Sequence, residues 1–162
     1  MGTIVIGVGG IGASNTPGDV VKTYALGSCV GLILIDTKVN AVGMVHIALP
    51  NSEINIQKSK ITPGYFADTG IPALLQLMAT KGSRKDGRGL LVKMAGGASI
   101  LDSNHTFDIG KRNILTIKKI LWKCGMGSLA EDVGGNHSRT VSVYVDTKEV
   151  VISTCGREDK KI

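Results

Sequence analysis

The apolar stretches of this chain are short and alternate with glycine-rich or polar turns. Residues 30–35 are almost uninterruptedly apolar, residues 36–40 are mostly polar, and an apolar pattern returns from Ala41 to Leu49. Two apolar runs of strand length joined by a short polar segment are typical of a β-hairpin. We therefore predict strands at Cys29–Ile35 and Ala41–Leu49, joined by a turn near Lys38.

Further strand-like and helix-like segments occur on both sides of this hairpin. The strand-like runs are Thr3–Val8, Asp19–Leu26, Leu90–Ala95, Gly127–Asp132, Thr140–Asp146 and Glu149–Cys155. Apolar residues follow helical spacing in Gly64–Thr80, which contains Pro72, and in Ile109–Lys123. Many strands with two helices favour an α/β domain, in which a mixed, largely antiparallel sheet packs against two main helices.

The length of 162 residues suits one domain with a sizeable core. We expect residues 1–156 to form this domain and the charged segment 157–162 to be a frayed tail. No stretch resembles a signal peptide or a membrane span. The sequence therefore predicts a cytoplasmic protein without direct membrane insertion.

Charge and cysteine usage exclude two classes of site. The net charge is +6, but the basic residues are dispersed, and at 4% the aromatic residues are too few to supply stacking platforms for bases. We therefore expect no nucleic-acid partner. The three cysteines lack the paired spacing of a metal site, so the sequence predicts neither a metal ion nor another cofactor.

Three glycine-rich segments resemble phosphate-binding loops only superficially. Residues 7–12 match Gly-x-Gly-x-x-Gly, but Pro17 and Gly18 predict a turn where a dinucleotide site needs a helix. Residues 95–99 and 133–136 are not followed by the Gly-Lys-Ser/Thr of a nucleotide-binding loop. Close backbone packing, or the walls of a narrow substrate slot, is the expected role of these two segments. His105 and His137 fall in polar loops and are expected to be ordinary exposed histidines.

The strongest chemical signal is a cysteine and a histidine on the predicted hairpin. Cys29 and His46 lie at nearly equal distances from the turn, so they face each other across the two strands. A thiol beside an imidazole can attack an amide or ester carbonyl, and the ion pair that they form lowers the pKa of the thiol. Thr23 can orient the imidazole. The backbone N–H groups of Gly27, Ser28 and Cys29 can form an oxyanion site. The alternative is that both side chains are ordinary core residues.

The residues around this trio resemble a known family. Thr23-x-x-Leu-Gly-Ser-Cys29-Val-Gly, followed by His46 in Met-Val-His-Ile-Ala-Leu-Pro, is similar to the CheD family of bacterial chemotaxis. Matching segments continue at 63–69, 93–99, 109–113 and 130–136, so that the resemblance runs from about Val5 to Val151. Members of this family are chemoreceptor glutamine deamidases.

The resemblance implies a CheD-like fold and a protein-glutamine glutaminase without a cofactor, in which Thr23, Cys29 and His46 are catalytic. Such an enzyme converts specific glutamines of chemoreceptors (methyl-accepting chemotaxis proteins) to glutamate through a cysteine thioester. The resemblance also allows the hydrolysis of glutamyl methyl esters as a second activity. The implied partners are the cytoplasmic helices of chemoreceptors and a CheC-type phosphatase.

Two other functions remain open at this point. One is a non-catalytic regulatory module that binds the CheC phosphatase and chemoreceptors, although such a module needs no Cys-His pair. The other is a general cysteine peptidase or amidase, which needs an extended substrate groove.

Overall fold

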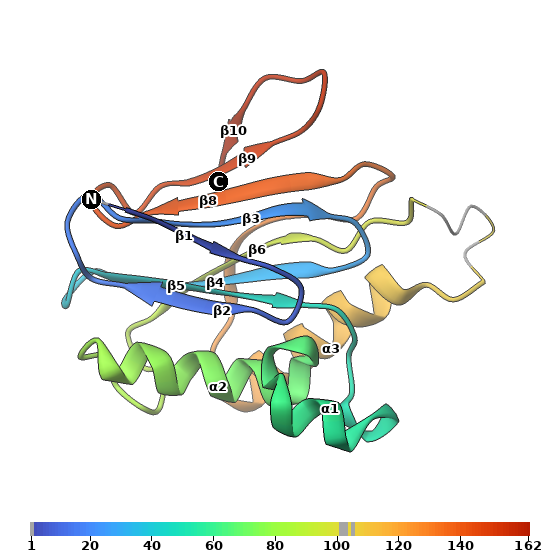
Figure 1. Cartoon of the computed structure of the whole chain (residues 1–162), viewed down its shortest axis with the longest axis horizontal. Coiled ribbons are helices and arrows are strands. Elements are labelled where there is room, and N and C mark those ends of the chain that lie inside the picture. Colours follow the sequence, from blue (N-terminus) through green and yellow to red (C-terminus); the bar gives the residue numbers. More distant parts are fainter. Residues whose placement is uncertain (1, 101–103, 105) are drawn as a thin grey trace.

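Two β-sheets pack face to face, and helices cover the outer face of one of them (Figure 1). The computed structural model describes residues 2–100, 104 and 106–162. Sheet A has five strands, which are, in spatial order, β1 (Thr3–Ile6), β3 (Val20–Leu26), β8 (Arg139–Tyr144), β9 (Val150–Ser153) and β10 (Lys160–Lys161). Sheet B also has five, which are β2 (Ile11–Ser14), β5 (Ala41–Ile47), β4 (Val30–Asp36), β6 (Leu91–Gly96) and β7 (Ser128–Val133).

The helices lie together on the side of sheet B that faces away from sheet A (Figure 1). They are α1 (Ile56–Ile61), α2 (Ala67–Thr80) and α3 (Ile109–Lys123), with single 3-10 turns at Ser52–Ile54 and Pro63–Tyr65. The predicted α/β class is confirmed. Pairing is antiparallel except between β1 and β3 and between β6 and β7, but the strands are divided between two sheets instead of forming one.

Strands β4 and β5 form the centre of the molecule and are buried along their whole length. Leu32 and Leu34 of β4 pack in the core shared with the helices, whereas Ile33 and Ile35 pack in the core between the sheets. Burial on both faces explains the unbroken apolar run of the sequence, since such a strand does not alternate between apolar and polar residues. Each of these side chains contributes roughly 1.5–3 kcal/mol through its removal from water.

The structure differs from the sequence-based expectations at four places. β2 is a strand that the sequence analysis did not predict, and it begins within the Gly-x-Gly-x-x-Gly segment. α1 buries none of its residues and therefore lacks an apolar periodicity that the sequence could reveal. α2 begins at Ala67 and remains helical through Pro72. The tail, which was expected to fray, returns along β9 and accepts a hydrogen bond from Lys93 Nζ at the Ile162 carbonyl (2.6 Å).

A close backbone contact joins the end of β6 to the start of β4. Gly96 has a φ of +110°, and a Cβ at this position would lie 2.3 Å from the carbonyl oxygen of Cys29. Only glycine combines this conformation with this approach. The contact places residues 97–99 beside Cys29 and so builds one wall of the site described below.

No helix in the described ranges is both long enough and apolar enough to cross a membrane.

Candidate active site

His46 and Thr23 meet in the interior, between the two sheets. His46 lies on β5 of sheet B and is 2% exposed, and Thr23 lies on β3 of sheet A and is fully buried. Thr23 Oγ1 is 2.7 Å from His46 Nδ1 and 2.8 Å from the carbonyl oxygen of Ile6. A single hydroxyl therefore connects the imidazole of one sheet to the backbone of the other.

These two contacts fix which ring nitrogen of His46 carries the proton. The Ile6 carbonyl can only accept a hydrogen bond, so the Thr23 hydroxyl uses its single proton there. His46 Nδ1 must then donate to Thr23 Oγ1, which leaves Nε2 of the neutral ring as the basic nitrogen. Within the described part of the chain, Nε2 has no hydrogen-bond partner.

The glycine-rich turn near the N-terminus holds the backbone of His46. The Gly9 N–H donates to the His46 carbonyl (2.8 Å), and the His46 N–H donates to the Gly10 carbonyl (3.0 Å). The turn itself is closed by a hydrogen bond from the Gly10 N–H to the Gly7 carbonyl (2.8 Å). The segment that resembles a dinucleotide motif thus fixes the backbone of His46 on β5. It follows directly after Ile6 in the chain, whose carbonyl accepts the hydrogen bond from Thr23.

Cys29 lies on the same face of sheet B as His46, next to the start of β4. In the β4–β5 ladder His46 pairs with Gly31, and Cys29 precedes Gly31 by two residues. Side chains two residues apart point to the same face, so Cys29 and His46 are diagonal neighbours, whereas the prediction had them nearly opposite each other as a cross-strand pair. Such neighbours have Cα atoms about 7–8 Å apart, within reach of each other's side chains. Cys29 is half-buried and packs against the core between the sheets.

Burial keeps both groups uncharged in the unliganded protein. It raises the pKa of the Cys29 thiol, and a weaker effect of the residue's own backbone N–H, which lowers that pKa, does not reverse the shift. Burial also lowers the pKa of His46 to about 4. The expectation of a thiol pKa lowered by an ion pair is therefore wrong for the resting state, because both charged forms lose solvation in this interior.

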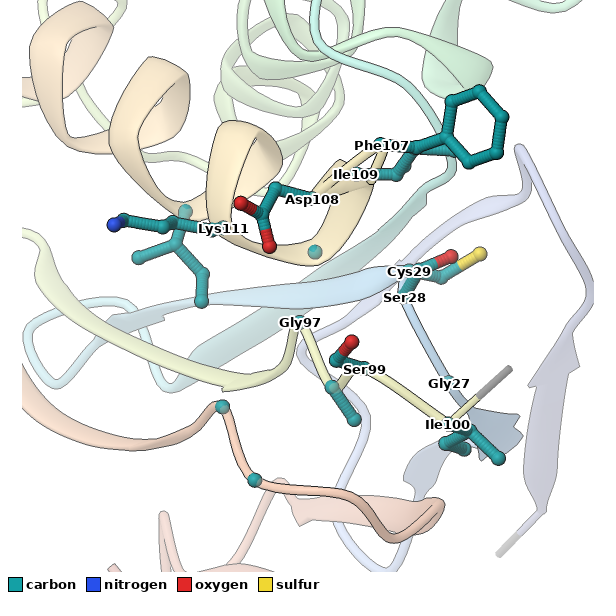
Figure 2. A pocket seen from close by; sticks show the side chains of 15 residues that line it. Gly27, Ser28, Cys29, Gly97, Ser99, Ile100, Phe107, Asp108, Ile109 and Lys111 are labelled. Carbon is teal, nitrogen blue, oxygen red and sulfur yellow. The ribbon is translucent and has the colours of Figure 1, made fainter. Parts of the chain in front are cut away.

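Cys29 opens into a pocket of about 820 Å³. Its walls come from four segments, which are residues 27–29, 97–100, 107–111 with Ile114, and 134–135. Figure 2 shows the sulfur of Cys29 on the side of Phe107 and Ile100, with the amine of Lys111 at the opposite end of the view. Both glycine-rich segments that were expected to pack closely or to wall a slot contribute to this lining. His137 lies beside Gly135 and is not among the lining residues.

The loop before Cys29 has its carbonyl groups fixed from one side. Gly27 O accepts from the Ala98 N–H (2.8 Å), and Cys29 O accepts from the Gly97 N–H (2.8 Å). Ser28 O accepts from Asn113 Nδ2 of α3 (3.0 Å). The Ser28 and Cys29 N–H groups form no backbone hydrogen bond to any described residue. Because N–H and C=O of a trans peptide point in opposite directions, these two N–H groups face away from Ala98 and Asn113.

The structure therefore brings together the five residues that the sequence singled out, on β3, β5 and the loop before β4. Sequence reasoning missed Asn113 and the Ile6 carbonyl. Asn113 did leave a signal, since it is a polar residue on the apolar face of a predicted helix, whereas a backbone acceptor has no signature in sequence. No group of three or more His, Cys, Asp or Glu side chains suited to a metal ion occurs among the described residues. His105 lies outside them.

Comparison with known proteins identifies the family. The model of the family described as "CheD chemotactic sensory transduction" matches residues 48–154. The chain belongs to the CheD family. The matched range begins after Thr23, Cys29 and His46, so the roles proposed for these residues depend on the geometry above.

Relatives of the family align with nearly the whole chain. A "Probable chemoreceptor glutamine deamidase CheD" of Syntrophotalea carbinolica is 55% identical over 157 residues, which cover 97% of each chain. A protein of the same name from Solibacter usitatus is 40% identical over 162 residues, 100% of this chain and 95% of its own. The "Chemoreceptor glutamine deamidase CheD" of Halalkalibacterium halodurans is 37% identical over 150 residues, 91% of each chain. The resemblance seen in the sequence is confirmed.

The buried neutral state of His46 predicts a loss of stability in weak acid. Because its pKa falls from 6.5 in the unfolded chain to about 4 in the folded protein, the unfolded chain binds more protons between these values. The contribution of His46 is constant above pH 6.5, and as the pH falls to about 4 it destabilises the fold by up to about 3 kcal/mol.

Urea unfolding from pH 7 to pH 4 measures this effect when the protein is compared with His46→Gln, whose side chain does not titrate. We expect the free energy of unfolding of the unmodified protein to fall more steeply with decreasing pH. All other titrating groups are shared by the two proteins and cancel in the difference. Parallel curves would show that His46 is not buried as the neutral base.

Proposed function

We propose that this protein is a chemoreceptor glutamine deamidase, which hydrolyses the side-chain amide of receptor glutamines to glutamate and ammonia with Cys29 as nucleophile. The observation that carries the proposal is the Thr23–His46 hydrogen bond, which leaves Nε2 as a base on the sheet face that also carries Cys29. The names of the family's relatives supply the substrate class. We expect the protein to act in the cytoplasm, on the cytoplasmic helices of the receptors.

The first chemical step starts from a neutral thiol and a neutral imidazole. The Cys29 thiol transfers its proton to His46 Nε2 while its sulfur attacks the carboxamide carbon of a bound glutamine. A carbon–sulfur bond forms, and the carbonyl oxygen of the substrate becomes an oxyanion. Since neither group is charged at rest, charge separation coincides with the presence of substrate, and the enzyme does not hold a reactive thiolate between turnovers.

The Ser28 and Cys29 N–H groups are the donors that we assign to the oxyanion. The carbonyl groups of the same two peptides are already bonded to Ala98 and Asn113, so that no reorganisation of the loop is needed. Loss of one such donor typically costs about 3–4 kcal/mol of transition-state stabilisation.

Breakdown of the tetrahedral adduct gives a thioester. The carbon–nitrogen bond breaks, and His46 returns its proton to the leaving group, which departs as ammonia. His46 then takes a proton from water, whose oxygen attacks the thioester carbon, and the carbon–sulfur bond breaks as Cys29 regains its proton. A glutamyl methyl ester would form the same thioester with methanol as leaving group, so hydrolysis of such esters belongs to the proposed chemistry.

Direct measurement of deamidation tests this proposal. Incubation with the cytoplasmic fragment of a chemoreceptor should raise the mass of particular glutamine peptides by about one dalton, the difference between an amide and an acid. The Cys29→Ala variant should leave these peptides unchanged. Cys124→Ala and Cys155→Ala are matched controls, because both of these cysteines are exposed and lie outside the pocket. They should retain full activity.

The same experiment separates the alternatives. The protein would be a non-catalytic regulatory module, and not an enzyme, if it forms a stable complex with the receptor fragment or with a CheC-type phosphatase while no glutamine changes. Cleavage of the receptor backbone would instead indicate a peptidase. The CheC-type phosphatase is proposed as a partner on the family resemblance alone.

Variants at Thr23 test the role of its hydroxyl. Thr23→Val keeps the shape of the side chain but leaves His46 Nδ1 without an acceptor, so that the ring loses its fixed tautomer. We expect a fall in kcat of about 10- to 100-fold, smaller than the loss in Cys29→Ala, because a hydroxyl orients the imidazole but takes no part in bond formation. Thr23→Ser restores the hydroxyl and should recover most of the rate. A Thr23→Val variant that is folded and as inactive as Cys29→Ala would contradict this ranking.

A further inference from the structure

Asn113 is an unexpected residue on the buried face of α3. It is fully buried, and the residues one and two turns further along the same face, Ile117 and Leu121, are part of the apolar core. Its Oδ1 atom has no hydrogen-bond partner among the described residues. A buried polar atom without a partner costs stability. The side chain is therefore not explained by the packing of the helix.

The amide nitrogen of Asn113 makes two contacts that join separate parts of the site. Nδ2 donates to the Ser28 carbonyl and to the Ala48 carbonyl, each at 3.0 Å. Both protons of the amide are thereby used, which fixes the orientation of the side chain. Ser28 directly precedes Cys29, and Ala48 follows His46 by two residues, just beyond the last ladder pair between Val30 and Ile47. One amide group thus links the loop that carries the thiol, just before β4, to the end of β5, which carries the imidazole.

The contact with Ser28 also determines where the Cys29 N–H points. The described chain contains no cis peptide bond, so the Ser28 carbonyl and the Cys29 N–H lie on opposite sides of one rigid plane. The backbone N–H of Cys29 lies close enough to its own sulfur to lower the thiol pKa. A hydrogen bond to the carbonyl of a peptide also polarises the N–H of that peptide. Asn113 therefore orients the Cys29 N–H and also makes it a stronger hydrogen-bond donor.

We propose that Asn113 is a positioning residue for the deamidation chemistry, which holds the Ser28–Cys29 peptide so that its N–H faces the oxyanion. This inference rests on the proposed function of Cys29. The neighbouring carbonyls of Gly27 and Cys29 are held by backbone N–H groups, which every substitution except proline leaves in place. Ser28 alone depends on a side chain, so its support can be deleted without altering the rest of the loop.

Two variants of Asn113 and one matched control test the proposal. Asn113→Leu keeps the approximate volume and removes the donor, and Asn113→Ala removes both. The control is Ile117→Ala, which shortens a fully buried side chain on the same face of α3 that belongs to the apolar core. Thermal unfolding establishes which variants are folded at the assay temperature.

We expect both Asn113 variants to lose about 10- to 100-fold in kcat on the receptor fragment, with KM changed by less than about two-fold, because the oxyanion forms only after substrate is bound. Ile117→Ala should lower the unfolding temperature while keeping kcat. An unchanged kcat in a folded Asn113→Leu variant would overturn the inference. An equal loss of kcat in Ile117→Ala would overturn it too, because the effect would then reflect general loosening of α3.

A second readout does not depend on turnover. In ¹H–¹⁵N correlation spectra the amide of Cys29 should shift in Asn113→Leu and stay in place in Ile117→Ala. If the Cys29 amide keeps its position in Asn113→Leu, the inference is wrong whatever the activity. If the unmodified protein shows no Cys29-dependent deamidation, the proposed function fails instead.

Discussion

The hydrogen bond between Thr23 and His46 is the interaction on which the site depends. It spans the interface between the two sheets, so it exists only where their packing brings β3 and β5 together. The Ile6 carbonyl takes the hydroxyl proton and thereby decides that His46 donates from Nδ1. The packing of the two sheets thus determines the tautomer of His46, and the tautomer determines that Nε2 is the basic nitrogen. A shift of either sheet would break this hydrogen bond and with it the constraint on the His46 tautomer.

Burial determines the charge states of His46 and Cys29 before substrate binds. In many thiol enzymes an ion pair with histidine lowers the thiol pKa, and the nucleophile is charged before substrate arrives. Here desolvation lowers the pKa of His46 and raises that of Cys29, so that the neutral pair is the resting state. The proposed oxyanion donors then become more important, because the negative charge that forms during the attack develops on the substrate carbonyl oxygen. In the proposed mechanism, the occupied carbonyls of Gly27 and Ser28 provide this preorganisation.

Much of the fold could be predicted from the sequence, for reasons that the structure explains. The β4–β5 hairpin and α3 have strong apolar patterns, and α3 has the predicted bounds Ile109–Lys123. Division of the strands into two sheets could not be predicted, because β4 is buried on both faces and its sequence does not show which neighbour covers which face. The hairpin was predicted correctly, yet its register places Cys29 diagonal to His46, since strand ends are poorly defined by apolar runs alone.

The candidate site was predicted less completely than the fold. The spacing of Cys29 and His46, with the family resemblance, drew attention to the trio whose catalytic roles remain proposals. The direction of the thiol pKa was mispredicted, because it depends on burial that only packing creates. Asn113 was overlooked although it interrupts the apolar face of a predicted helix. The role proposed for Asn113 depends on its hydrogen bonds to the Ser28 and Ala48 carbonyls, and these tertiary contacts have no signature in the sequence.

Hydroxylamine reveals whether the reaction passes through a thioester on Cys29. Hydroxylamine attacks thioesters faster than water does and converts a glutamyl thioester to the hydroxamate. In its presence we expect receptor glutamines to yield glutamyl hydroxamate at the same positions that otherwise become glutamate, and neither product with Cys29→Ala. Glutamate formation that is undiminished by hydroxylamine, or that persists in Cys29→Ala, would show that no thioester forms on Cys29.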